Sequence, residues 1–229
     1  MTRCVATGVL VIALLAAPPA ARPNGEQPPS AVQQPSTRFE RFVLSGCSPC
    51  VRESHPVKKV AIPPLTFPAF PRFKAGTRSR AGEIAFEVVR AWELGRAGRQ
   101  ALAVRVALSV AAVQSNEPVQ IAAGVLDAEH VGALADAVSE MAKAAVVALP
   151  DAGPDSIDID FHGGSLRVGV IRIRGDAVAY IQAGDVPTLA LRPVWEVPVT
   201  LYLPVSELPA LTAAIAEVMA KMQRLRGSY

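Results

Sequence analysis

The sequence predicts an α+β fold in which an antiparallel sheet of about eight strands carries two helices on one face. From Glu83 onward, apolar residues recur with a period of two, which is typical of half-buried strands. Near residues 131 and 208 the period changes to that of an amphipathic helix. The two helical patterns match at an offset of 77 residues, which indicates a duplicated strands-then-helix module.

The start of the chain predicts export. Arg3 precedes an uncharged apolar run that is interrupted at Pro18, and small residues follow. This pattern is typical of a secretory signal peptide, and the run is shorter than the ~20 apolar residues of a membrane span. We therefore expect residues 1–21 to be a leader cleaved near Ala20 or Ala21. The protein would then act in the periplasm or outside the cell, and it would touch a membrane only through an uncleaved leader.

Composition divides the rest of the chain. Residues 22–37 are rich in proline, glutamine and serine, which predicts a flexible linker. Residues 38–82 contain a Cys-x-x-Cys motif and then a proline-rich segment, 56–71, that we expect to form an extended strap, because proline disrupts helices and central strands. The remaining ranges are the α+β domain, 83–229, and its two modules, 83–150 and 151–229.

The first module should contain strands and then a helix. Alternating apolar residues predict strands near residues 84–88, 102–110 and 119–126, with a turn at Gly95 to Gly98. Asp127 is a plausible N-cap for the helix that follows. The apolar stripe of this helix consists of Val131, Leu134, Val138, Met141 and Ala145.

The second module should begin with hairpins. Gly163-Gly164 predicts a two-residue turn that places Phe161 opposite Leu166 and Asp160 opposite Arg167. Gly175-Asp176 predicts the next turn, and a last strand runs over residues 197–203. Ser206 would cap the final helix, with Pro209 in its first turn. Its apolar stripe consists of Leu208, Leu211, Ile215, Val218 and Met222.

The order of these elements resembles the duplicated strands-then-helix layout of Pur-alpha-like and Whirly-like proteins, which bind single-stranded nucleic acids. The resemblance is one of layout. A net charge of +3 and an aromatic content of 5% argue against that function, because such binding relies on basic patches and exposed rings. We therefore expect no nucleic-acid partner.

The motif Cys47-Ser48-Pro49-Cys50 resembles the active site of thioredoxin-like oxidoreductases. Cleavage of the leader would leave Cys47 and Cys50 as the only cysteines, and such a pair in an exported chain is usually a disulfide. A thioredoxin-like site also needs a long helix after its second cysteine, which Pro56 and the prolines after it disfavour. We expect a structural disulfide, and a thiol-disulfide redox protein is the alternative.

A second candidate site lies on a predicted strand. Asp158, Asp160 and His162 alternate, so their side chains project from one face. Two carboxylates and an imidazole suit a divalent metal, which makes a metal-dependent hydrolase the weaker alternative. The other interpretation is an ordinary exposed strand face on which Asp160 pairs with Arg167.

The distribution of charge gives a candidate partner surface. Residues 52–105 hold 11 basic and 4 acidic residues, and four of the basic ones, Arg72, Lys74, Arg78 and Arg80, lie within nine positions. This cluster would suit an acidic envelope polymer or another protein, unless the charges are neutralised within the fold. The sequence contains no Gly-x-Ser-x-Gly, His-Glu-x-x-His or Walker motif. The expectation is therefore a non-enzymatic binding or structural module of the bacterial cell envelope, without a cofactor.

Overall fold

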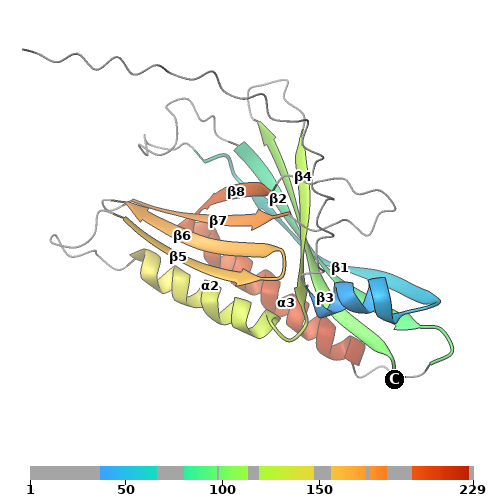
Figure 1. Ribbon diagram of the computed structural model, residues 1–229. Helices are drawn as coiled ribbons and strands as arrows, with labels where there is room; N and C mark the ends of the chain where they lie inside the picture. Colours follow the sequence, from blue (N-terminus) through green and yellow to red (C-terminus); the bar gives the residue numbers. More distant parts are fainter. Residues whose placement is uncertain are drawn as a thin grey trace, which may run out of the picture. The chain divides into compact units, whose positions relative to one another are not determined.

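The computed structural model describes residues 37–65, 80–96, 98–112, 119–146, 156–173, 176–184 and 198–226. The predicted leader and the predicted linker up to residue 36 lie outside these residues, as do Arg72, Lys74 and Arg78. The described residues form two four-stranded antiparallel sheets, β1-β2-β3-β4 and β5-β6-β7-β8, together with helices (Figure 1). The α+β class is confirmed, but the expectation of one sheet with eight strands is wrong.

Each sheet is followed by a long helix, so the order of four strands and then a helix occurs twice. The first half of the described chain contains α1 (Arg38–Arg41), the π-helical turn η1 (Phe42–Gly46), β1 (Cys50–Ile62), β2 (Arg80–Glu93), β3 (Gln100–Ala112), β4 (Gln120–Asp127) and α2 (Val131–Val146). The second half contains β5 (Ser156–Gly163), β6 (Leu166–Ile173), β7 (Asp176–Ala183), β8 (Val199–Pro204), the 3-10 turn η2 (Val205–Glu207) and α3 (Leu208–Arg226).

The period of two determines the strands as the sequence predicts. From Val104 to Val110 in β3, the buried residues Val104, Val106, Leu108 and Val110 alternate with half-buried ones. The start of the proline-rich strap is itself a strand, β1, at the edge of its sheet. The register of β1 with β2 shifts between Pro56 and Lys58, which fits the rule that proline is tolerated in edge strands and at bulges.

Each long helix packs on the sheet of the other half. Helix α2 contacts β5 and β6, α3 contacts β1 and β2, and the two helices lie side by side (Figure 1). The expectation that both helices cover one face of a common sheet is therefore wrong. Helix α2 lies between β4 and β5 in the chain, and β5 pairs with β6 and not with β4, so the second four strands form a sheet of their own that packs on α2.

One hydrophobic core joins the two halves. Both predicted helical stripes are buried, and they meet the inner faces of both sheets in a single cluster. The largest fully buried members include Phe86 in β2, Leu126 in β4, Leu201 in β8 and Ile215 in α3. Because burial of apolar surface is the main favourable term in folding, the two halves stabilise each other.

The strand pairing in the second sheet differs from the pairing that the predicted turns imply. Gly163 pairs with Leu166, which makes Gly164-Ser165 the turn and places Asp160 opposite Gly169 instead of Arg167. Ile173 pairs with Asp176, so Asp176 lies in a strand and not in the predicted Gly175-Asp176 turn. The apolar pattern changes after Val170, which predicts either a bulge or a sheet covered on both faces, and the continuous register of β6 with both of its neighbours shows that there is no bulge.

A contact between the two sheets explains the first of these turns. Ser165 N–H donates to the carbonyl of Val125 at 3.3 Å, and Val125 N–H donates to Ser165 Oγ at 2.8 Å. Gly164 has a φ of +56°, and a Cβ atom there would collide with the Val125 carbonyl oxygen. The β5–β6 turn therefore docks against β4 and covers part of the outer edge of the first sheet.

The final helix begins later than expected. Ser206 lies inside η2, and α3 starts at Leu208 with Pro209 in its first turn, as predicted. No helix in the described ranges has both the length and the apolar character that a membrane crossing would require.

Candidate functional site

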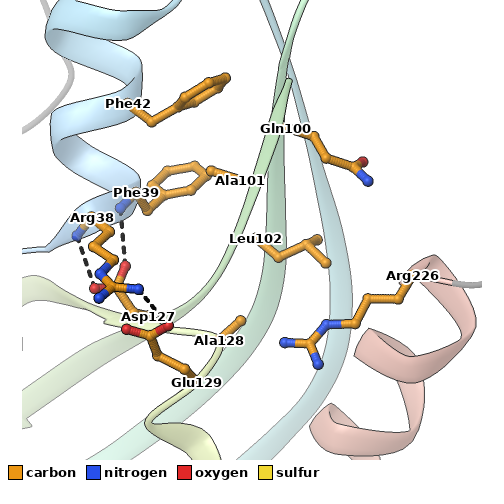
Figure 2. A pocket seen from close by; sticks show the side chains of 10 residues that line it. All are labelled: Arg38, Phe39, Phe42, Gln100, Ala101, Leu102, Asp127, Ala128, Glu129 and Arg226. Atoms are coloured by element: carbon orange, nitrogen blue, oxygen red, sulfur yellow. Dashed lines mark hydrogen bonds and ion pairs between the residues drawn. The ribbon is translucent and has the colours of Figure 1, made fainter. Parts of the chain in front are cut away.

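An open pocket of about 450 Å³ lies where β3 extends beyond the end of β4 (Figure 2). The last pair between these strands joins Ala103 to Asp127, so Gln100 and Leu102 have a neighbouring strand only on the β2 side. Helix α1 forms one wall of the pocket, and the last residue of α3, Arg226, reaches it from the other side. The pocket thus results from two adjacent strands of unequal length.

Asp127 holds α1 in place. Its carboxylate accepts hydrogen bonds from the backbone N–H groups of Arg38 at 2.8 Å and Phe39 at 2.9 Å. The predicted role of Asp127 as N-cap of α2 is therefore wrong, because the carboxylate satisfies the free N–H groups of a different helix. Thr37 and Glu40 complete that end of α1 with a reciprocal capping box.

The pocket has an apolar wall and an ion pair at its rim. Phe42, Ala101 and Leu102 supply half-buried carbon surface, and the Phe39 ring behind them is only 1% exposed. At the rim, the exposed Arg38 guanidinium lies 2.9 Å from the Glu129 carboxylate. Apolar walls with a few polar groups are typical of small-molecule sites.

Two polar groups face the pocket from the side of β3 and α3. Gln100 accepts a hydrogen bond from Arg90 Nε through its Oε1 at 3.0 Å. The Arg226 side chain extends from the end of α3 toward β3 and Ala128 (Figure 2). Among the residues that the structure describes, Arg226 has no ion-pair partner.

The predicted cysteine pair lies next to the wall formed by α1 and η1. A disulfide joins Cys47 to Cys50, and their Cα atoms are 5.0 Å apart. Cys47 directly follows η1, and Cys50 is the first residue of β1. Arg99 supports this segment by donating to the Gly46 carbonyl at 2.7 Å while its other nitrogen lies 2.7 Å from the buried Glu93 carboxylate. Because a strand follows Cys50, the helix that a thioredoxin-like site places after its second cysteine is replaced by β1.

The predicted metal ligands lie on the outer face of the second sheet. Asp160 accepts hydrogen bonds from Arg167 Nε at 2.6 Å and interacts with His162 Nε2 at 2.8 Å. Burial opposes ionisation of Asp160, but the hydrogen bonds from Arg167 and His162 keep the pKa of its carboxyl below the ordinary value. Asp158 lies beside this cluster, 3.6 Å from Arg167.

A buried tyrosine completes this face. Tyr180 lies opposite Gly169, where any Cβ would come within 2.6 Å of the tyrosine ring, and its hydroxyl donates to Asp158 at 3.3 Å. Burial and the charge of Asp158 raise the pKa of Tyr180 to about 12. Among the described residues, no group of three or more histidine, cysteine or acidic residues is arranged to hold a metal. Metal binding at Asp158, Asp160 and His162 stays a prediction.

The basic cluster cannot be compared with the pocket. Arg72, Lys74 and Arg78 lie outside the described residues, and only the backbone of Arg80, the first residue of β2, is described. The structure therefore does not test the predicted contact with an acidic partner.

Comparison with other proteins gives no family. The sequence matches no protein-family model, and no curated protein is similar enough to count as a match. The case for function therefore depends on the geometry of the chain itself.

Proposed function

We propose that this protein is exported and acts outside the cytoplasm as a non-enzymatic binding module of the cell envelope, with the pocket beside α1 as its ligand site. The observation that carries the proposal is the Cys47–Cys50 disulfide at the end of the segment that forms the pocket wall. Disulfides form and persist in oxidising compartments and are rare in the cytosol. An oxidising environment would therefore keep this wall in place.

The chemistry of the lining supports binding more than catalysis. The ten lining residues include no serine, threonine, cysteine, histidine, lysine or tyrosine, which are the usual nucleophiles and many of the usual proton carriers. The Asp127 carboxylate is occupied by two backbone N–H groups, and Glu129 is paired with Arg38. The volume falls within the ~300–1,000 Å³ range of small-molecule sites.

The test of export and of the disulfide is an intact mass. The full chain is expressed in a bacterial host, cells are fractionated, and the protein is weighed with and without reductant and thiol alkylation. We expect an extracytoplasmic species cleaved near Ala20 or Ala21 and two hydrogens lighter than its reduced form. A full-length cytoplasmic chain with free thiols would contradict the proposal. Rapid opening by mild reductant, with reductase or isomerase activity, would favour the redox alternative.

The test of the pocket compares two matched substitutions. Ala128→Phe places a ring at the pocket, whereas Ala133→Phe places the same ring on the exposed face of α2. Small molecules retained by the native protein are measured by native mass spectrometry after gentle purification from the envelope fraction. Loss of the retained mass in Ala128→Phe but not in Ala133→Phe is the expected result. Equal retention in both variants would place the ligand elsewhere.

A further inference from the structure

The outer edge of β4 carries backbone groups that are free to pair with another strand. β4 is the last strand of its sheet, so one of its sides has no neighbouring strand among those that the structure describes. Near the end of β4 this side is occupied, because the N–H and the carbonyl of Val125 bond to Ser165 in the β5–β6 turn. Backbone groups of a strand point to the same side at every second residue. The groups of Ala123 and Ile121 therefore also point away from β3, and neither residue bonds to another described residue on that side.

The side chains along this part of the edge are apolar and exposed. Ile121 is 67% exposed, and Val119, just before β4, is 51% exposed. Because Ala122 is buried in the core, Ile121 projects from the opposite, outer face of the sheet, where its partner on β3 is the small residue Ser109. An exposed apolar edge of this kind is a template for pairing with another chain.

Two other edge strands are protected against such pairing. β1 has a proline at its register shift, followed by the exposed Lys58 and Lys59, and β5 has the exposed Asp158 and Asp160. Proline lacks the N–H that a paired strand donates, and like charges that face each other across two strands repel. β4 has neither a proline nor a charge before Asp127. A second copy of the β4 edge can therefore approach it without repulsion between like charges.

We infer that two copies of this protein associate through an antiparallel β4–β4 pair centred on Ile121. In this register Ile121 faces its counterpart in the second copy, and Val119 faces Ala123. Pairing satisfies the outward backbone groups of these residues and covers both exposed apolar side chains. It ends before Val125, whose backbone groups are bonded to Ser165. The first sheets of both copies become one sheet of eight strands, and the inference does not depend on the proposed ligand pocket.

The test measures association of the purified, oxidised protein by sedimentation velocity over a micromolar to millimolar concentration series. We expect a reversible monomer–dimer equilibrium that is weak, because three residue pairs cover less surface than the ~1,600 Å² of a standard interface. Ile121→Lys places two like charges opposite each other and should weaken dimerisation by about tenfold or more. The matched control is Leu94→Lys, which replaces a leucine that is 60% exposed just after β2 and should leave dimerisation unchanged.

A second variant isolates the contribution of the backbone. Ala123→Pro removes an N–H that points away from β3, so the pairing with β3 should survive, as far-UV circular dichroism and the urea midpoint will show. This variant should also weaken the dimer. A dimer that is weakened by Ile121→Lys but not by Ala123→Pro would mean that side chains touch without strand pairing, and the inference would be wrong.

Two further outcomes would overturn the inference. One is a protein that stays monomeric throughout the concentration series, and the other is equal dimerisation of Ile121→Lys and Leu94→Lys. If the monomer nevertheless protects the amides of Ile121 and Ala123 from hydrogen exchange, the edge is covered by another segment of the same chain. Retention of a ligand in the Ala128→Phe and Ala133→Phe comparison is measured independently, so failure of the dimer leaves the proposed function standing.

Discussion

Replacing Gly164 with alanine tests whether the β5–β6 turn joins the two sheets. Gly164 has a φ of +56°, and an added Cβ would collide with the Val125 carbonyl oxygen and lie 2.7 Å from Thr37 Cγ2. A left-handed conformation costs a residue with a Cβ roughly 1–2 kcal/mol. The displaced turn would also lose its two hydrogen bonds to Val125, at about 0.5–1.5 kcal/mol each. We therefore expect Gly164→Ala to lower the free energy of unfolding by about 2–5 kcal/mol.

Two other glycines supply the controls for this measurement. Gly95 has a φ of +81° but nothing within 4 Å of an added Cβ, so Gly95→Ala isolates the backbone cost. Gly132, near the start of α2, also has open space and no positive φ, and its replacement by alanine should stabilise the helix by up to about 1 kcal/mol. Urea unfolding followed by far-UV circular dichroism gives all three values. If Gly164→Ala costs no more than Gly95→Ala, the contact between the turn and β4 does not stabilise the fold.

The remaining predictions concern the disulfide and the outer face of the second sheet. Replacing Cys47 and Cys50 by serine should lower the free energy of unfolding by about 2 kcal/mol, because the disulfide closes a short loop, with a sequence separation of 3, and so restricts the unfolded chain. An unchanged urea midpoint would contradict this prediction. The pKa of Asp160 is lowered in the folded state, so its contribution to stability is present above the unfolded value near 3.8 and is lost as the pH falls through the folded pKa. Asp160→Asn should therefore make stability less sensitive to pH below about 4, and parallel curves for both proteins would refute the assignment. Ultraviolet titration should show one phenol ionising near pH 12 that disappears in Tyr180→Phe, whereas titration of every folded-state phenol near pH 10 would show that Tyr180 is not perturbed.

The sequence predicts elements well where the pattern is local. The strands β2, β3 and β4 and the stripes of α2 and α3 follow from periodicity alone, because burial of one face requires it. The turns of the second sheet are a different case. Moving a turn by one residue shifts the strand register by two, and every side chain then stays on the same face. Alternation therefore cannot distinguish Gly163-Gly164 from Gly164-Ser165, and the contact with Val125 decides between them.

The division into two sheets and the pocket depend on contacts between distant parts of the chain. Apolar patterns show that β4 and β5 are strands but not whether they pair with each other, and in the structure β4 pairs with β3 whereas β5 pairs with β6. The pocket forms because β3 extends past β4 and the end of α3 approaches α1. Neither of these two arrangements can be predicted from a local sequence pattern. The sequence does indicate that Asp127 caps a helix. The carboxylate caps α1, near the start of the chain, and not α2, which follows Asp127 in the sequence.

Because each long helix packs on the sheet of the other half, neither half of the chain can be inherited or engineered as a separate unit. A polypeptide ending after α2 would lack both the sheet on which α2 packs and the helix α3 that covers its own sheet. The remaining fragment would likewise lack α2 and the sheet that α3 covers. Two such fragments relate to each other as subunits of an obligate heterodimer do, each completing what its partner lacks. The same geometry also offers a route to larger assemblies, because a helix that covers the sheet of another copy would form the existing interface between chains.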